Sequence, residues 1–315
     1  MGEGLLSGVA VCICTYKRPE MLAACLKSVG RLQRPDDMRS VVIVIDNEDS
    51  EQTREIVRAA NANSNIPIEC HTEKQRGLCF ARNAALSQAL EWHADQIVFM
   101  DDDQTVPPDW LIAMLHAQKV TGAMVIQSSI EFRKVGGTLI KVAQRQWQHD
   151  LPQAYSGGVL LASELVRPDG YSLRFDERFN LSGGEDRWFF LQAKAVGAKI
   201  VLTPEAIITE HVIDQKDKLS VLFKRRFDAY RVASLQDLEM LGPRETYLRV
   251  ARFAPLAFYK GISSLILSGI ILPFNRRYAR KKIRKATSAI SESVGAFSGL
   301  WGRRLPNSYS TTIGR

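Results

Sequence analysis

Residues 97–103 read Ile-Val-Phe-Met-Asp-Asp-Asp, an apolar run that ends in three consecutive aspartates. Three neighbouring carboxylates repel one another, and a bound divalent cation would relieve that repulsion. Hard oxygen ligands suit Mg²⁺ or Mn²⁺, which also bridge to phosphate groups. An acidic turn, with Thr105 or Asp109 capping the next helix, explains the same residues without a metal. By itself this stretch leaves both explanations open, because short motifs often match by chance.

Apolar runs of strand length alternate with helix-like segments through the first half of the chain. Strands are predicted at 9–14, 41–45, 67–70 and 97–100, and helices from Pro19 and at 51–62, 79–93 and 109–121. Continuous apolar runs are typical of strands buried on both faces of a sheet. Their alternation with helices predicts an α/β fold, a doubly wound mixed sheet with helices on both faces.

Polar clusters follow three of these strands, at 15–18, 46–49 and 101–103. In doubly wound sheets, ligands bind just beyond the carboxyl ends of the strands. The sequence therefore predicts a ligand site at this edge of the sheet, with the three aspartates in it.

The second half has a different character. A strand is predicted at 157–161, a helix at 188–196 and a short strand at 198–202. From about residue 219 the sequence is helical, and Gly242-Pro243 mark a break. We therefore expect an α/β domain over residues 1–240 and a helical, basic region over 241–315.

Five motifs occur in a recognisable order. They are Cys-Thr-Tyr-Lys-Arg-Pro at 14–19, Ile-Asp-Asn at 45–47, Gly-Leu-Cys-Phe-Ala-Arg-Asn at 77–83, Asp-Asp-Asp at 101–103 and Gly-Gly-Glu-Asp at 183–186. From residue 9 to about 235 the chain resembles family 2 glycosyltransferases with the GT-A fold. It is similar to bacterial exopolysaccharide glucosyltransferases of the succinoglycan type. The resemblance implies that residues 1–240 are a GT-A catalytic domain.

The resemblance also implies a site for a nucleotide-sugar donor. The residues that it assigns to the donor are Thr15, Arg18, Asp46, Gly77, Arg82 and Asp101. Free N–H groups at a helix start favour anions, and an arginine fork fits phosphate or ribose oxygens. Asp46 with Asn47 also suits a simple turn after a strand. A surface arginine behind a helix-opening glycine is the corresponding alternative for Arg82.

The family pattern in the acidic run is Asp-x-Asp, which implies that Asp103 coordinates Mg²⁺ or Mn²⁺ at the donor diphosphate. His211 matches a later metal ligand of many such enzymes. A bound metal would neutralise charge on the leaving nucleoside diphosphate. The alternative for His211 is a packing or surface role, and Asp102 occupies the variable position.

Glu185 and Asp186 supply the acids needed for transfer to a hydroxyl. Attack on an anomeric carbon needs a base that removes the hydroxyl proton. In the resembling family the second acid of the pair is that base, so we assign it to Asp186, and Glu185 to acceptor orientation. An Asp at a helix start is also a suitable cap. Trp188 is expected to stack on an acceptor sugar or to lie in the core.

The resemblance implies an inverting enzyme that transfers one hexose, with UDP-glucose as the expected donor and a saccharide or lipid-linked oligosaccharide as the acceptor. The Gln-x-x-Arg-Trp motif of processive synthases is missing: Gln144-Arg145-Gln146-Trp147 has the wrong spacing and place. One alternative is a sugar-phosphate nucleotidyltransferase, but the loop after the first strand has no glycine. Another is a non-catalytic adaptor that uses its basic tail to bind a membrane or a nucleic acid.

The basic charge is concentrated at the C-terminus. Residues 244–315 carry 14 Lys or Arg and 2 acids, a net charge of +12, which leaves −4 for residues 1–243 because the whole chain has +8. The apolar stretch 253–274 precedes a basic cluster at 276–285, a combination that suits an anionic membrane surface. A buried helix or a nucleic-acid-binding tract would also fit, but we favour the membrane and expect no nucleic acid as partner.

The N-terminal residues and the cysteines indicate a cytoplasmic protein. The start, Met1-Gly2-Glu3-Gly4, has an acid and no basic region, so we expect no signal peptide. The five cysteines include no Cys-x-x-Cys pair and are expected to be reduced thiols. We therefore expect a location on the inner face of the cell membrane.

Overall fold

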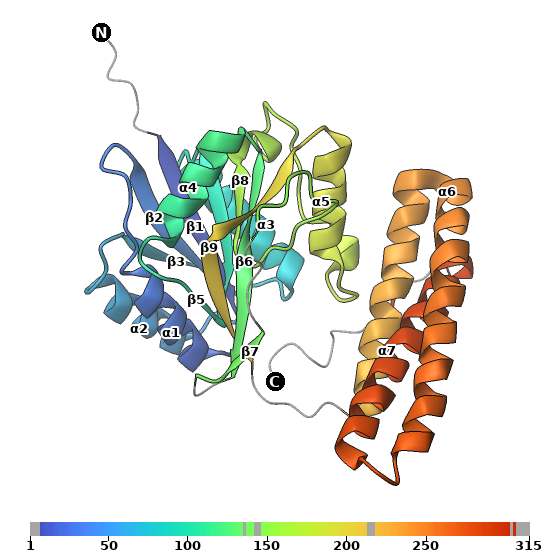
Figure 1. Cartoon of the computed structure of the whole chain (residues 1–315). Helices are drawn as coiled ribbons and strands as arrows, with labels where there is room; N and C mark the ends of the chain where they lie inside the picture. The colour runs from blue at the N-terminus through green and yellow to red at the C-terminus, as the bar shows by residue number, and fades with distance from the viewer. Residues whose placement is uncertain (1–6, 135–136, 142–145, 213–217, 303–304, 307–315) are drawn as a thin grey trace. The chain divides into compact units, whose positions relative to one another are not determined.

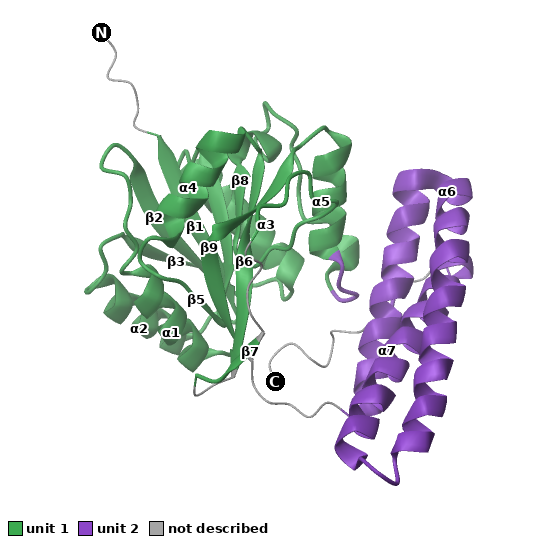
Figure 2. Cartoon of the chain, viewed as in Figure 1, with its two compact units in different colours: residues 1–180, 185–214, 314–315 green, residues 181–184, 215–313 purple. Residues whose placement is uncertain are grey.

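The computed structural model describes residues 7–134, 137–141, 146–212, 218–302 and 305–306. The chain divides into two compact units (Figure 2). The first comprises the described residues within 1–180 and 185–214, and the second those within 181–184 and 215–313.

Strands and helices alternate through the first unit (Figure 1). In chain order they are β1 (Gly8–Thr15), α1 (Pro19–Val29), β2 (Arg39–Asp46), α2 (Glu51–Asn61), β3 (Ile68–Thr72), α3 (Leu78–Glu91), β4 (Gln96–Asp101), β5 (Gln104–Thr105), α4 (Trp110–Thr121), β6 (Val125–Lys134), β7 (Leu139–Lys141), β8 (Val159–Ala162), the short 3-10 helices η1 (Ser163–Leu165) and η2 (Glu177–Phe179), α5 (Glu185–Ala195) and β9 (Ile200–Val212).

The described strands form one mixed sheet of nine strands, in the order β3-β2-β1-β4-β8-β6-β9-β5, with β7 paired to β6. Strand β1 runs parallel to β2 and β4, and β2 runs parallel to β3. Strand β8 runs antiparallel to β4 and β6. The carboxyl ends of β1, β2 and β4 therefore meet at one edge, as a doubly wound sheet requires.

Two apolar layers cover the two faces of this sheet. Alternate residues of β1 divide between them, with Val9, Val11 and Ile13 in one layer and Ala10 and Cys12 in the other, because strand side chains alternate in direction. The first layer includes side chains of α1, α2 and α4, and the second includes those of α3 and α5. The predicted mixed α/β sheet with helices on both faces is confirmed.

The sequence did not indicate β6, and the reason is the polarity of its buried side chains. Gln127, Ser128 and Ser129 are at most 3% exposed. Their side chains donate to the backbone oxygens of Gly157, Gly158 and Thr203, so each polar group is satisfied inside the sheet. A strand of this kind lacks the apolar run on which the sequence prediction depends.

The five cysteines are free, and Cys12, Cys25 and Cys79 are buried. Burial raises the pKa of the Cys12 and Cys25 thiols well above the ordinary value. Buried thiols with raised pKa values are poor nucleophiles, so these side chains act as small apolar groups in the core.

The second unit is helical and consists mainly of α6 (Leu219–Ile271) and α7 (Arg276–Trp301). Helix α6 breaks at Gly242, where φ is 80°, so it is two segments, 219–241 and 243–271. Pro243 starts the second segment, where its missing N–H has no intrahelical role. The side chain of Asn275 caps α7 by accepting the N–H of Tyr278.

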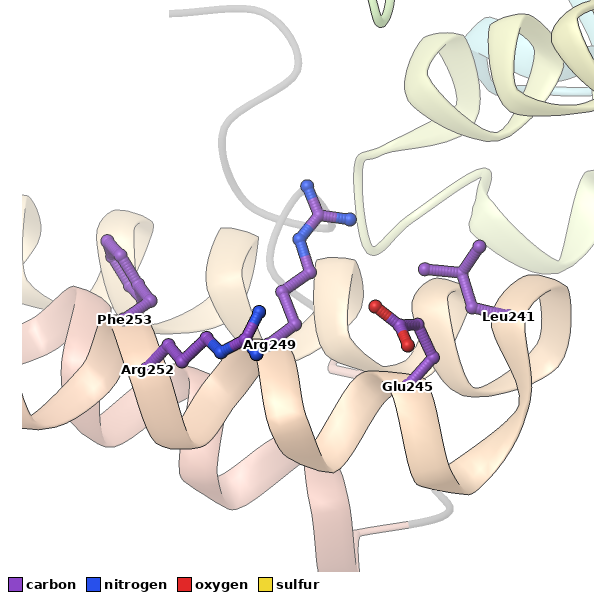
Figure 3. A pocket seen from close by; sticks show the side chains of 5 residues that line it. All are labelled: Leu241, Glu245, Arg249, Arg252 and Phe253. Carbon is purple, nitrogen blue, oxygen red and sulfur yellow. The ribbon is translucent and has the colours of Figure 1, made fainter.

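A hollow of about 440 Å³ lies beside this break (Figure 3). It is lined by Leu241, Glu245, Arg249, Arg252 and Phe253. Arg249 also forms an ion pair with the buried Asp237, 3.3 Å away, which ties the second segment of α6 to the first.

Glycines of α7 bring it into backbone contact with the first segment of α6. An ideal Cβ on Gly295 would lie 2.3 Å from the carbonyl oxygen of Phe227, and one on Gly299 would lie 2.6 Å from that of Arg231. The segment 219–241 therefore belongs to the helical unit, whereas the sequence predicts the boundary near residue 240. The assignment of catalysis and membrane attachment to separate parts stays a prediction.

One described helix, α6, is long and apolar enough to cross a bilayer by length and composition alone. Only 22% of the apolar 18-residue stretch of this helix is buried within the chain.

Two glycine substitutions test this helix packing. Gly295→Ala should destabilise the helical unit by about 1–3 kcal/mol, since the new methyl group meets backbone that cannot give way. The matched control Gly269→Ala has open space around its Cβ and should stabilise by up to about 1 kcal/mol through helix propensity. Thermal unfolding combined with trypsin digestion measures both. Equal melting temperatures for the two variants would contradict the packing.

Candidate active site

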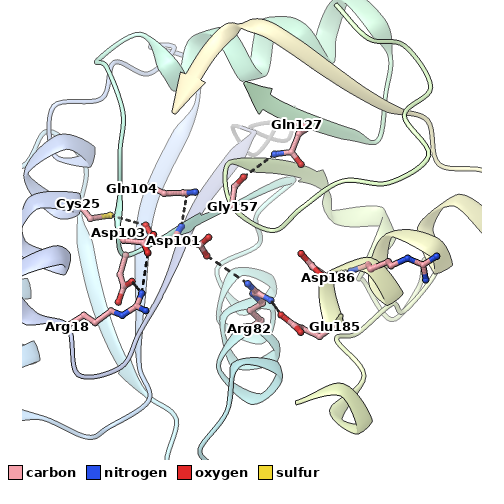
Figure 4. A network of polar contacts seen from close by, with 12 residues as sticks. Arg18, Cys25, Arg82, Asp101, Asp103, Gln104, Gln127, Gly157, Glu185 and Asp186 are labelled. Carbon is pink, nitrogen blue, oxygen red and sulfur yellow. Dashed lines mark hydrogen bonds and ion pairs between the residues drawn. The ribbon is translucent and has the colours of Figure 1, made fainter. Parts of the chain in front are cut away.

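The candidate site lies at the carboxyl ends of β1, β2 and β4. In the sheet register Thr15 lies opposite Asp46, and Cys14 lies opposite Asp101. The pairing brings the first, second and fourth sequence motifs to one edge, although up to 86 residues separate Thr15 from Asp101 in the chain. Figure 4 shows the polar network that extends from this edge.

Asp102 points back toward the loop after β1. Its carboxylate accepts the Thr15 hydroxyl at 2.8 Å and one N–H of Arg18 at 3.1 Å. Burial raises the pKa of Asp102, and the Arg18 charge opposes that rise. The variable residue of the acidic run therefore fixes the β1 loop.

Arg18 also reaches Asp103, at 3.3 Å from the same nitrogen. Burial raises the pKa of Asp103, and the negative charge of Asp102 raises it further. Thr15 and Arg18 were assigned to the donor, and the structure places both beside the aspartates, which accept from the Thr15 hydroxyl and from one guanidinium nitrogen of Arg18. A donor contact through either residue stays a prediction.

Arg82 is the centre of the network. It is 5% exposed, its guanidinium donates to Glu185 at 2.8 Å, and it lies 3.8 Å from the carboxylate of Asp101 (Figure 4). A single buried cation thus joins the acidic strand end to the acid pair of α5. The surface alternative for Arg82 is wrong, because its guanidinium is buried between two carboxylates.

Asp186 lies in the first turn of α5, beside Glu185. Burial raises the pKa of Asp186 from the ordinary 3.8 to about 6, the negative charge of Glu185 contributes to the rise, and Arg82 opposes it. A carboxylate whose pKa is close to neutrality is matched to removing a proton at physiological pH. Its Oδ1 accepts the N–H of Arg187, so the helix start also holds it in place.

Three residues that the sequence analysis did not single out support Asp101. The Gln104 side chain accepts the Asp101 N–H at 3.0 Å, and Gln127 donates to the Gly157 oxygen at 3.0 Å (Figure 4). An ideal Cβ on Gly157 would lie 2.7 Å from the Asp101 carboxylate and 2.6 Å from the Gln104 amide nitrogen, so a larger residue there would displace one of these side chains. The Gly157-Gly158 pair was the available sequence signal.

Strand β9 brings two more side chains to the acidic run. The backbone N–H of His211 donates to the Asp103 carbonyl at 3.1 Å. The imidazole Nε2 of His211 lies 2.9 Å from the Thr105 hydroxyl. Burial raises the pKa of Glu210 to about 7, and Asp103 and Asp101 repel its charge. Glu210 adjoins the predicted ligand His211, but the sequence analysis did not single it out.

The side chains around the acidic run have the chemistry that a hard divalent cation prefers. Asp101, Asp103 and Glu210 offer carboxylate oxygens, and their pKa values are raised first by burial and then by the negative charges of neighbouring carboxylates. Among the residues that the structure describes, no group of three or more His, Cys, Asp or Glu side chains converges on one metal position.

Asp46 is fully buried, and both of its oxygens have backbone partners. It accepts the N–H groups of Glu48 at 3.0 Å and Ser50 at 2.6 Å. This is the turn that the sequence offered as the alternative to nucleoside binding. The structure supports that alternative, and a direct nucleoside contact of Asp46 stays a prediction.

The start of α3 is held by two asparagines. Asn47 accepts the Gly77 N–H at 2.8 Å, and Asn180 accepts the Cys79 N–H at 3.1 Å. These N–H groups are therefore occupied by protein, and the anion-binding role expected for Gly77 stays a prediction. Trp188 is 4% exposed and packs against Phe179, which supports its core alternative.

The mixed sheet, with an acidic strand end and an acid pair at one edge, is an α/β fold of the GT-A type. A family model described as glycosyl transferase family 2 matches residues 10–179. The chain belongs to that family, and the resemblance found in its motifs is confirmed.

The chain is similar to two curated proteins of Rhizobium meliloti (strain 1021). Succinoglycan biosynthesis protein ExoM is 29% identical over 304 residues, which is 94% of each chain. Succinoglycan biosynthesis protein ExoO is 27% identical over 188 residues, which is 54% of this chain and 52% of ExoO.

Solved structures share the fold. S. aureus TarS 1–349, in complex with UDP-GlcNAc, has a TM-score of 0.56 at 17% identity and covers 90% of both chains. The mannosyltransferase PcManGT from Pyrobaculum calidifontis, in complex with GDP-Man and Mn²⁺, has a TM-score of 0.58 at 15% identity, with 94% of this chain and 88% of that one covered. The predicted GT-A fold is confirmed.

The buried Arg82–Glu185 pair makes a testable contribution to stability. Arg82→Met should cost about 3–5 kcal/mol, because it leaves the Glu185 carboxylate buried without its partner. Glu185→Gln should cost less, because Asp101 remains 3.8 Å from the Arg82 guanidinium. The double variant should lose much less than the sum of the two, as urea unfolding at pH 7 would show. The exposed pair Arg54–Glu51 is the control, and its coupling should be much weaker because solvent screens both charges. Strict additivity at Arg82 and Glu185 would exclude the coupling.

Proposed function

We propose that the chain transfers one hexosyl group from a nucleotide sugar to a saccharide acceptor with inversion at the anomeric carbon. The observation that carries the proposal is the position of Arg82, which joins Asp101 at the acidic strand end to Glu185 beside Asp186. Donor and base functions would thus occupy the two sides of one buried cation.

In the proposed reaction Asp186 is the base. The acceptor hydroxyl oxygen attacks the anomeric carbon, the bond from that carbon to the donor phosphate oxygen breaks, and Asp186 takes the hydroxyl proton. The nucleoside diphosphate leaves with the bonding electrons. The ion pair of Glu185 and Arg82 lies beside the base. Burial and then Glu185 raise the pKa of Asp186, and the positive charge of Arg82 limits that rise.

Asp103, with Asp101 and His211 beside it, would hold Mg²⁺ or Mn²⁺. Such a metal neutralises negative charge on a leaving diphosphate. These ions are usually bound by one or two carboxylates together with phosphates and water, so Asp103 and Asp101 offer a sufficient protein share. The Mn²⁺ that accompanies GDP-Man in the structure of PcManGT supports the choice of ion.

The substrates are inferred from the relatives. UDP-glucose is the first donor to test, and UDP-GlcNAc and GDP-mannose follow from the ligands of TarS and PcManGT. The similarity to ExoM over 94% of each chain supports a role in exopolysaccharide biosynthesis. We infer a lipid-linked oligosaccharide acceptor and a place at the inner face of the cell membrane. Thermal shift with each donor and Mn²⁺ identifies the donor.

Asp103→Ala tests the metal contact. The variant should lose the Mn²⁺-dependent stabilisation by the donor, because the carboxylate proposed to hold the metal is gone. The exposed control Asp36→Ala should keep it. Calorimetric titration of the donor with Mn²⁺ or EDTA gives the measurement. Donor binding by the wild-type protein that EDTA leaves unchanged would rule out the metal role.

Asp186→Asn tests the base. Turnover should fall by about 10²–10⁴-fold while donor affinity stays near the wild-type value, since only the proton acceptor is removed. Asp169→Asn, on an exposed loop, is the control. Turnover within a few-fold of wild type would place the base elsewhere, and an α-linked product by NMR would exclude inversion.

The pH dependence follows from the raised pKa of Asp186. Wild-type kcat/KM should rise about tenfold per pH unit below about 6 and level off above it, because only the ionised carboxyl accepts a proton. The folded state holds the Asp186 proton more tightly than the unfolded chain, so ionisation between about pH 4 and pH 6 lowers stability. Asp186→Asn should therefore gain melting temperature relative to wild type as pH rises through this range. A constant difference would contradict the shift.

A further inference from the structure

The second segment of α6 turns its large apolar side chains outward. Leu256 is 62% exposed, Ile266 63%, Ile270 62% and Phe274, just beyond the helix, 87%. Tyr259, Ile262, Leu265 and Leu267 are also exposed. We call the exposed apolar side chains of residues 253–274 the apolar ridge. Large contiguous apolar surfaces of this kind normally mark an interaction site.

From residue 254 onward, the buried positions of the same segment are occupied by small residues. Ala254, Ala257, Gly261 and Ser268 recur every three to seven positions and are buried. They allow α7 to approach closely, since an ideal Cβ on Gly261 would lie 2.5 Å from the side chain of Ile290. A bundle folded for water would bury its Leu, Ile and Phe side chains. Helices in contact with lipid typically have small residues where they pack together and large apolar residues on their outer faces.

The basic cluster lies at the same level as the apolar ridge. Gly261 faces Ala286 and Ile290, and Ala254 packs with Ala296, so α7 runs antiparallel to the second segment of α6. The start of α7 therefore lies alongside residues 262–274, and Figure 1 shows the short connection between the two helices. The exposed cations there are Arg276, Arg277, Arg280, Lys281, Arg284 and Lys285.

We propose that the hairpin of residues 253–285 lies in the plane of an anionic bilayer surface and does not cross it. In this position the apolar ridge enters the boundary between headgroups and acyl chains, and the cations of α7 contact anionic headgroups. A helix that crossed the bilayer would bring these cations into the hydrocarbon at the level of the ridge, which is costly. A nucleic acid would match the cations but leave the ridge in water. The inference deepens the proposed membrane association and depends on it.

Vesicle sedimentation of the full chain tests this orientation. The wild-type protein should bind phosphatidylcholine vesicles with 30% phosphatidylglycerol at least tenfold more tightly than pure phosphatidylcholine vesicles. Carbonate at pH 11 should release it. Equal binding to both vesicles, or retention after carbonate treatment as for a spanning helix, would overturn the inference. Release by competing duplex DNA would overturn it in favour of a nucleic-acid partner.

Matched variants separate the two contributions. Arg277→Glu/Arg280→Glu/Lys281→Glu should weaken binding to anionic vesicles at least tenfold, and Ile266→Ser/Ile270→Ser should weaken it to a similar degree. The control Lys27→Glu/Arg31→Glu/Lys119→Glu makes the same change in net charge on exposed residues of the first unit and should bind as wild type. Circular dichroism confirms folding. Weakening by the control equal to that of the α7 variant would show a non-specific charge effect and sink the proposal.

An activity assay in detergent keeps this test apart from the proposed function. The α7 and ridge variants should retain transfer to a soluble saccharide while losing vesicle binding. If wild-type protein binds vesicles but transfers no sugar from any donor, the proposed function fails and the docking surface stands. If it transfers sugar but ignores anionic vesicles, the docking surface fails alone.

Discussion

The buried ion pair between Arg82 and Glu185 is the interaction on which the candidate site depends. It fixes the first turn of α5 relative to α3 and leaves the guanidinium close enough to Asp101 to balance the strand end. Removal of the Arg82 cation would leave the carboxylate of Glu185 buried without a compensating charge, which is strongly destabilising. The geometry of the acids is therefore set by charge balance as much as by the sheet.

Most of the fold was predictable because its central strands are apolar and its helices are separated from them by short links. The runs at 9–14, 41–45 and 97–100 became β1, β2 and β4, and their order predicted where the polar clusters meet. Strand β6 was missed because Gln127, Ser128 and Ser129 hide their polarity in hydrogen bonds that only the tertiary structure supplies. A local sequence pattern cannot show these hydrogen-bond partners, because they are distant in the sequence.

The candidate site was predictable at the level of motifs but not of pairings. The acidic run and the Glu185-Asp186 pair stand out in the sequence, yet nothing in it shows that Arg82 joins them from a third motif. Asp46 illustrates the opposite case: the residue stood out, but its oxygens serve the local turn. Glu210 became a candidate only because β9 pairs with β5 beside the aspartates.

The alanine, glycine and serine seam of the helical unit has a practical meaning. Such a seam gains little from water exclusion, since little apolar area is buried between the helices. The helices are held together by close van der Waals contact, which an apolar medium does not weaken and which water strengthens little. Mild surfactants, usually added only to keep such chains dispersed, would for this part of the molecule act as the more native medium.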